Sequence, residues 1–326
     1  MKRRVIKQGH NTLTVTLPKE WVSKNNIKPG DEIDIAIKDK SLIINTDKGP
    51  ELSSTIVDVS GLTPPLIWRF ISSAYRAGYD EIRVIGIESG KKNLYTAFSY
   101  DTVDYLRQKD MITMSPIEVV QAVTNRLIGV EIIDQKEKYC TIKDLGETTY
   151  KEFDNSLRRI FHLLKNEMEI VRSGFEGNKN ELRSIHLIDT NLDRFEDFCF
   201  RVLNKKGYEN FRKTSTVYNI VFMLEMLGDQ IKKVAIHIME FKIRNPKILI
   251  DSLQKNYEQL NNFINLFYDF KKEKAKEIFE TGKKHVEILE SHEKKLNQNE
   301  KEILYHLKKI ASHILSLLEL RIDMEY

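Results

Sequence analysis

The fold of the N-terminal segment follows from residues 12–37, which read TLTVTLPKEWVSKNNIKPGDEIDIAI. Apolar and polar residues alternate from residue 12 to residue 17, which is typical of a strand with one apolar face, and Pro18 ends the pattern. Residues 19–24 are long enough for one short helix. A turn is predicted at residues 28–31, because proline fixes φ and the following glycine can adopt φ > 0.

A hairpin is expected after this turn. Residues 33–37 alternate again, and residues 42–44 supply a second apolar strand beyond a polar turn. A module of ~45 residues buries too little surface to enclose a core by itself. A second copy of the chain is therefore expected to complete it.

Positive charge is concentrated at the start of the chain, although the net charge of the 326 residues is only +4. Lysine and arginine neutralise phosphates and release counterions, so a basic surface doubled in a dimer favours duplex DNA. His10 and Asn11 lie in the turn before the first strand, where they can reach a base edge or a phosphate. The predicted DNA-binding residues are Lys2, Arg3, Arg4, Lys7, His10, Asn11 and Lys19.

The order of these motifs resembles the SpoVT/AbrB swapped-hairpin family. The resemblance rests on residues 9–22 (GHNTLTVTLPKEWV) and 27–33 (IKPGDEI), and it covers almost all of residues 1–47. It implies a homodimer whose two chains interlock their strands, and it implies DNA binding by residues 1–48. Related modules also serve as partner-binding or purely dimerising units, so a solvated basic face on a dimerisation module is the alternative.

Residues 49–148 are predicted to form a small α/β domain. Gly78 is expected to end a helix in the left-handed conformation, and Ser115 with Glu118 is a typical helix start. The expected strands span residues 55–59, 81–87, 130–133 and 139–142, and the expected helices span residues 64–77, 101–108 and 115–126. The region contains no glycine-rich phosphate loop.

Residues 149–326 are predicted to be entirely helical, because only Pro246 interrupts a long stretch rich in Leu, Ile, Lys and Glu. Breaks between about six helices are expected at residues 174–178, 206–207, 245–246, 271–272 and 297–299. Pro246 divides these helices into two groups of three, which indicates an internal repeat of two three-helix units.

Acidic pairs lie on two of these helices. Asp189 and Asp193 flank the apolar stripe of one helix, and Glu225 with Asp229 has the same spacing of four on the next, so each pair shares one helix face. If the two helices pack antiparallel, the four carboxylates converge. Hard oxygen donors suit iron, manganese, magnesium or calcium better than a structural zinc site, although zinc stays among the candidates.

The helical half resembles PhoU, a family of phosphate-uptake regulators built from two three-helix repeats. The resemblance rests on residues 192–195 (LDRF) with Asp189 before them, and on residues 224–229 (LEMLGD), where Met226 replaces the arginine of the family signature. It implies a metal site at Asp189, Asp193, Glu225 and Asp229. Residues 69–80 and 127–132 extend the likeness to archaeal PhoU proteins that carry an AbrB domain.

The second repeat departs from this signature. Lys308 and Ser312 stand where its acids are expected, and Lys284 follows the surviving Glu280. An ammonium group repels a cation, so no second metal cluster is predicted. Lys233 lies four residues after Asp229, in position for an ordinary ion pair, which is the alternative reading of the first acidic site.

The fold class predicted from these patterns is multidomain α+β. Its parts are a swapped-hairpin β domain at residues 1–48, an α/β domain at residues 49–148 and a PhoU-like all-α bundle at residues 149–326. The chain lacks a long apolar run, a signal-peptide pattern and a CxxC motif, so a cytoplasmic protein without membrane insertion is expected. No nucleophile–base pair or cofactor loop is found, which argues against an enzyme.

The expected function is therefore DNA-binding regulation of phosphate uptake, with the helical half as a sensor or partner-binding domain. The alternative is an adaptor that docks on a phosphate transporter ATPase or a signalling kinase. In that case the hairpin domain only dimerises the protein.

Overall fold

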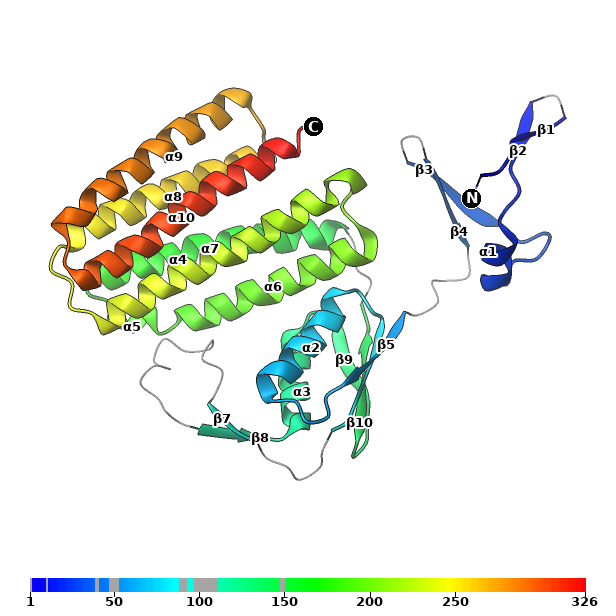
Figure 1. Ribbon diagram of the computed structural model, residues 1–326, viewed down its shortest axis with the longest axis horizontal. Coiled ribbons are helices and arrows are strands. Elements are labelled where there is room, and N and C mark those ends of the chain that lie inside the picture. Colours follow the sequence, from blue (N-terminus) through cyan, green and yellow to red (C-terminus); the bar gives the residue numbers. More distant parts are fainter. Residues whose placement is uncertain are drawn as a thin grey trace. The chain divides into compact units, whose positions relative to one another are not determined.

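The computed structural model describes residues 2–9, 11–38, 41–46, 53–87, 93–96, 111–146 and 150–326 (Figure 1). It divides into two compact units, residues 1–53 and 54–326, and each is treated by itself. His10, the predicted helix at residues 101–108, and both predicted domain boundaries, at 48/49 and 148/149, lie outside the described residues.

The first unit consists of two small antiparallel pairs around a short helix. Strand β1 (Ile6–Gln8) pairs with β2 (Thr12–Thr14), and β3 (Ile33–Lys38) pairs with β4 (Ser41–Thr46). Helix α1 (Lys19–Lys24) has the predicted bounds. In the predicted turn, the backbone N–H of Asp31 donates to the carbonyl of Lys28 at 3.1 Å, and Gly30 has φ +96°.

The strand predicted at residues 12–17 is shorter than expected and ends at Thr14. Its partner β1 was not predicted and is only three residues long, so the backbone beyond Thr14 has no strand to pair with among the described residues. None of the side chains described in this unit is buried, and Leu13 is 70% exposed. The described side chains of a single copy therefore form no hydrophobic core.

The second unit begins with a mixed four-stranded sheet in the order β5-β6-β10-β9. Strands β5 (Ser54–Asp58) and β6 (Glu81–Ile85) are parallel, as required when helix α2 (Pro64–Arg76) connects them. Strands β9 (Val130–Gln135) and β10 (Tyr139–Asp144) follow helix α3 (Pro116–Arg126). A separate pair, β7 (Asn93–Thr96) and β8 (Met111–Met114), was not predicted.

The local signals that limit α2 and α3 are confirmed. Gly78 has φ +94° just beyond α2, and a Cβ at this position would lie 3.2 Å from Cβ of Lys205. Ser115 and Glu118 form a reciprocal capping box at the start of α3. Gly78 thus serves both to end α2 and to let a later helix approach closely.

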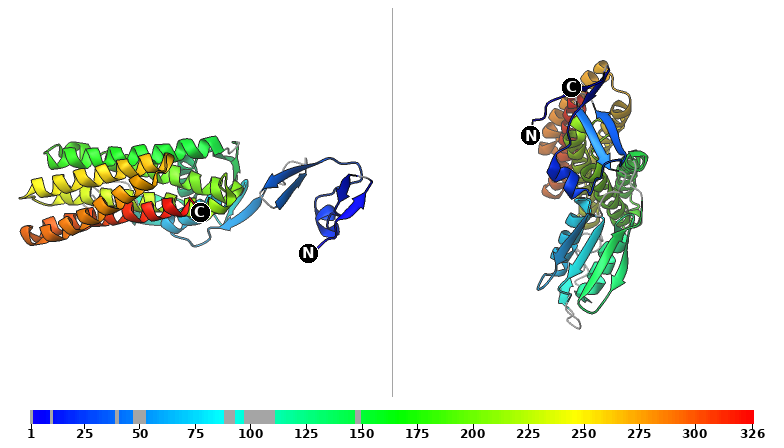
Figure 2. Two further views of the ribbon diagram at one scale, coloured as in Figure 1. Left: turned by 90° about the horizontal axis from the view of Figure 1, so that it is seen from above. Right: turned by 90° about the vertical axis from the view of Figure 1, so that its right-hand side faces the viewer.

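The remaining chain is helical and runs as long helices alongside one another (Figure 2). Its elements are α4 (Tyr150–Phe175), α5 (Lys179–Leu182), α6 (Ile185–Lys206), a 3-10 turn (Phe211–Lys213), α7 (Thr214–Glu240), α8 (Pro246–Tyr268), α9 (Lys272–His292), a second 3-10 turn (Glu293–Lys295) and α10 (Gln298–Asp323). The predicted breaks are confirmed; the short α5 and the two 3-10 turns were not predicted.

One hydrophobic core joins both groups of three helices, because α7 packs against α10 and α4 packs against α8. The α/β layer is attached to this bundle through α2, which contacts the sheet strands β5 and β6 and also α6. Within the described ranges, no helix has both the length and the apolar character needed to cross a membrane.

Candidate functional site

The predicted DNA-binding side chains form an exposed basic group in the first unit. Lys2, Arg3 and Arg4 precede β1, Lys7 lies within it, and Lys19 begins α1; all are exposed, as is Asn11. In the described part of the chain, none of these basic groups pairs with a carboxylate. Their charges are therefore available to an anionic partner.

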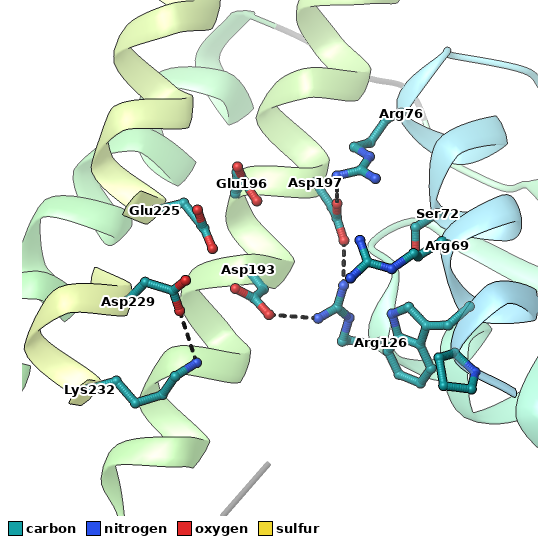
Figure 3. A pocket seen from close by; sticks show the side chains of 12 residues that line it. Arg69, Ser72, Arg76, Arg126, Asp193, Glu196, Asp197, Glu225, Asp229 and Lys232 are labelled. Atoms are coloured by element: carbon teal, nitrogen blue, oxygen red, sulfur yellow. Dashed lines mark hydrogen bonds and ion pairs between the residues drawn. The ribbon is translucent and has the colours of Figure 1, made fainter. Parts of the chain in front are cut away.

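A second candidate site lies where the α/β layer meets the bundle, in a cavity of about 220 Å³ (Figure 3). Helix α6 supplies Asp193, Glu196 and Asp197, and helix α7 supplies Glu225 and Asp229. Helix α6 packs against α7, so the acidic pairs predicted from their spacing do face the same region. The sequence reasoning did not predict the cations that face them.

Arginines from the α/β layer reach into the acidic group. Arg126 of α3 donates from Nη1 to Asp193 Oδ2 at 2.9 Å and from Nη2 to Asp197 Oδ2 at 2.7 Å. Its guanidinium lies 4.9 Å from the ring centre of Trp68, and Arg76 of α2 approaches Asp197 at 3.4 Å. Arg126 and Asp193 are 67 residues apart, so no local pattern identifies this pair.

Lys232 forms ion pairs with the other two predicted acids, Asp189 and Asp229. Its Nζ donates to Asp189 Oδ2 at 2.6 Å and lies 3.1 Å from Asp229 Oδ1. Asp189 is itself buried. The ion pair expected between Asp229 and Lys233 is therefore formed by Lys232, whose position three residues after Asp229 directs it toward α6.

Glu167 of α4 is a further acid that the sequence reasoning missed. It is fully buried, and neither of its carboxylate oxygens has a hydrogen-bond partner among the described residues. Its surroundings include Asp189, Lys232 and Asp193. A signal was present in the sequence, because Glu167 occupies a position on the apolar stripe between Leu164 and Val171, where an uncharged side chain is expected.

The acids around the cavity outnumber the basic side chains beside them, and the pKa values of several of these acids are raised. Burial, together with Asp229, raises the pKa of Glu225 to about 8. Burial and the neighbouring Asp189 raise the pKa of Asp193 to about 7, although Arg126 opposes the shift. Burial also raises the pKa values of Glu167 and Glu196 well above their ordinary range. The site therefore holds protons at neutral pH or requires a further cation.

The carboxylate oxygens of this cavity suit a hard cation. The described acids are, however, not arranged as the coordination shell of a metal ion. Across the described ranges, no three His, Cys, Asp or Glu side chains are grouped closely enough to hold a metal ion. Lys232 stands between Asp189 and Asp229, and Arg126 binds Asp193. Glu196 and Glu225 form no hydrogen bond or ion pair with the described residues, so they are the acids free to bind a cation in the cavity.

The positions in the second repeat that correspond to the predicted acidic pairs do not carry an equivalent group of acids. Lys308 lies 3.8 Å from Glu293, and Ser312 Oγ donates to the carbonyl of Lys308 at 2.9 Å. Glu280 pairs with Lys276 at 3.7 Å on the exposed face of α9. These residues make only local surface contacts.

The raised pKa values predict that folding stability falls as pH rises from about 6.5 to about 8.5 in the absence of added metal. Across this window the folded state loses the protons of Asp193 and Glu225, whose pKa values are about 7 and about 8, whereas an unfolded carboxyl has already lost its proton. The folded state binds more protons, so the free energy of unfolding decreases with pH, by about 1 kcal/mol per pH unit.

Urea unfolding followed by circular dichroism at several pH values measures this slope. His285 and His306, whose pKa values burial lowers to about 4, act in the opposite direction only below about pH 6.5. The double variant Asp193→Asn/Glu225→Gln is expected to flatten the slope. The exposed Asp154→Asn is the control, and a wild-type slope of zero contradicts the prediction.

A buried arginine fixes the α/β layer beside this cavity. Arg201 of α6, whose side chain is 1% exposed, donates to the carbonyls of Tyr75 and Tyr79 at 2.7 and 2.8 Å and to Asp144 Oδ2 at 2.7 Å. Lys205 also pairs with Asp144, at 2.9 Å, and with Asp80. This contact fixes the end of α2 and strand β10 against α6.

Comparison with known proteins found matches to the N-terminal region and to the helical region. Residues 6–51 match the family described as "Antidote-toxin recognition MazE, bacterial antitoxin". A solved structure, the phosphate transport system regulatory protein PhoU from Streptococcus pneumoniae, is 16% identical with a TM-score of 0.44, over 54% of this chain and 97% of that chain. Comparison with curated proteins gave no match.

The N-terminal region thus matches a MazE/AbrB-type module, and the C-terminal helical region resembles the solved PhoU structure. At 16% identity the second match concerns the fold alone.

Proposed function

We propose that the protein is a homodimeric DNA-binding regulator of phosphate uptake. The observation that carries the DNA-binding part is the exposed and unpaired basic group of Lys2, Arg3, Arg4, Lys7 and Lys19 on a module that matches the MazE family. Exposed lysine and arginine bind phosphates mainly by counterion release, so the affinity is strongly salt-dependent. Asn11 and His10 are proposed to contribute contacts to bases or phosphates from the adjoining turn.

Dimerisation is supported by the apolar side chains that one copy leaves in solvent. Val5, Ile6, Leu13, Val15, Ile35 and Leu42 are all exposed in the first unit. Exposed apolar side chains in a small unit, none of whose described side chains is buried, are typical of a protein interface. A second copy of the module covers these residues and doubles the basic surface presented to DNA.

The helical half is proposed to act as the sensor, through the acidic cavity and a divalent or ferric metal. Asp193, Glu196, Glu225 and Asp229 line the cavity, and Lys232 must move away before Asp189 and Asp229 can bind a cation. A bound metal supplies positive charge that the buried carboxylates lack. The connection to phosphate uptake rests on the sequence resemblance of residues 192–195 and 224–229 to the PhoU family.

Fluorescence anisotropy of the full-length protein on random and genomic duplex DNA, from about 50 to about 300 mM salt, tests the proposal. Wild type is expected to bind with an affinity that falls steeply as salt increases. Replacement of Lys2, Arg3, Arg4 and Lys7 by alanine removes up to eight phosphate contacts per dimer, and therefore reduces the slope of log affinity against log salt by up to about 7.

The matched control removes the same charge elsewhere. Replacing Lys272, Lys274, Lys283 and Lys284, which are exposed on α9, by alanine is expected to leave the slope nearly unchanged. If the N-terminal variant binds DNA as wild type does, the basic group is not the DNA interface. If wild type does not bind DNA at low salt, the adaptor function on a transporter ATPase or signalling kinase replaces this proposal.

A further inference from the structure

Two histidines face each other across the contact between α7 and α10, which pack side by side (Figure 1). His237 lies in the last turn of α7 and His306 lies near the start of α10, 69 residues later. Their Nε2 atoms are 3.3 Å apart, and their ring planes differ by 23°. Neither histidine lines the acidic cavity.

The hydrogen bonds around this pair leave one ring nitrogen unsatisfied. Nδ1 of His306 lies 2.9 Å from Oε1 of Gln230, and an amide oxygen can only accept, so this nitrogen carries the proton. Nε2 of His306 therefore offers a lone pair, and His237 must donate to it from its own Nε2. This places a lone pair on Nδ1 of His237, an atom that is buried, forms no hydrogen bond with the described residues and lies 3.8 Å from Glu240 Oε2.

We propose that His237 and His306 form a binding site for a divalent transition-metal ion of borderline softness, such as Ni²⁺, Cu²⁺ or Zn²⁺, with water completing its coordination. Two nitrogens that each lie about 2.0–2.1 Å from a tetrahedral metal ion are about 3.3–3.4 Å apart, which matches the separation of the two Nε2 atoms. Each ring needs only to tilt so that the two lone pairs converge on one ion.

Metal binding gives every ring nitrogen of the pair a partner. With the ion on both Nε2 atoms, the proton of His237 moves to Nδ1 and faces the carboxylate of Glu240, while Nδ1 of His306 keeps its bond to Gln230. Metal-binding histidines commonly donate their second nitrogen to a carboxylate or another oxygen in this way. The exchange moves one proton within His237 and releases none.

The surroundings allow an ion to enter and keep both rings neutral. The side chain of His237 is 21% exposed, and His306 is partly exposed. Burial lowers the pKa of both histidines, to about 4 for His306, so both rings are neutral at neutral pH and each keeps one nitrogen with a lone pair. Lys233 adds unfavourable positive charge near His306, and Glu240 and Glu302 beside His237 offset it.

This site differs in chemistry from the acidic cavity. Imidazole nitrogens favour Ni²⁺, Cu²⁺ and Zn²⁺ and do not favour Mg²⁺ or Ca²⁺, whereas carboxylates accept the hard ions. The two sites are therefore expected to separate by metal type. Loss of metal binding at one site is expected to leave metal binding at the other site intact. The histidine site is therefore tested independently of the proposed sensor function.

Calorimetric titration of the full-length protein with Ni²⁺ at pH 7.5, together with electron paramagnetic resonance of the Cu²⁺ complex, tests the site. The spectrum is expected to show hyperfine coupling to two equivalent imidazole nitrogens. His237→Gln and His306→Gln are each expected to weaken Ni²⁺ binding at least tenfold and to remove this coupling, as is usual when a ligand is lost.

His162→Gln, which replaces an exposed histidine of α4, is the matched control and is expected to keep Ni²⁺ affinity. Circular dichroism checks that each variant is folded. If the His237 and His306 variants bind Ni²⁺ as wild type does, or if the Cu²⁺ spectrum lacks nitrogen coupling, the pair is an ordinary N–H···N hydrogen bond and the proposal is wrong.

Discussion

Replacing Arg201 by alanine is expected to lower the free energy of unfolding by about 3–5 kcal/mol. The substitution removes the donor for the carbonyls of Tyr75 and Tyr79 and leaves the buried carboxylate of Asp144 with Lys205 as its remaining cation. Burial disfavours the charged form of Asp144, but Arg201 and Lys205 hold its pKa below the ordinary value. Without Arg201, the free-energy cost of burying this carboxylate is no longer offset. Urea unfolding followed by circular dichroism measures the change.

An exposed arginine of the same bundle supplies the control. Arg158 pairs with Asp154 four residues earlier, and the two side chains are 56% and 48% exposed. Surface pairs of this kind contribute at most about 1 kcal/mol, so Arg158→Ala is expected to have little effect. Equal losses for the two variants would mean that the buried contact does not hold the α/β layer on α6.

Replacing Leu13 and Val15 by aspartate is expected to convert the protein from a dimer into a monomer. Both side chains are exposed in one copy, and placing charges on a surface that must be buried against a second copy is strongly unfavourable. Light scattering after gel filtration is expected to give the mass of one chain, 38.3 kDa, where wild type gives twice that value. Affinity for DNA is expected to fall by about 100-fold or more, since the two basic surfaces are no longer linked.

Ile56→Asp provides the comparison, because Ile56 is also an exposed apolar residue but belongs to strand β5 of the second unit. This variant is expected to remain dimeric and to bind DNA normally. A dimeric Leu13→Asp/Val15→Asp protein would place the dimer contact outside the hairpin module. Retained circular dichroism of the helices distinguishes loss of the interface from loss of the fold.

Much of the fold was predictable because its signals are local. The helix breaks at residues 206–207 and 245–246, the bounds of α1 and the left-handed Gly78 all follow from residues that are close in sequence. The strand at residues 12–17 was predicted too long, because periodicity specifies a face but not whether a ladder partner exists. Strand pairing is decided by other parts of the chain.

The candidate site was predictable only in part for the same reason. The spacing of Glu225 and Asp229 places them on one helix face, and the spacing of Asp189 and Asp193 does so on the preceding helix. The partners of these acids come from elsewhere: Arg126 from α3, and Lys232 through its reach from α7 to Asp189. Sequence reasoning identified the acids and not the charges that face them.

The sequence by itself therefore determined the long helices, the apolar stripes and the basic N-terminal segment, because helix and strand periods act between residues a few positions apart. Tertiary structure alone decided that Arg126 meets Asp193, that Glu167 is buried without a hydrogen-bond partner among the described residues, and that His237 meets His306. The first and last of these pairs join residues 67 and 69 positions apart. Contacts at such separations depend on how whole helices pack, and that packing is settled by the shared hydrophobic core.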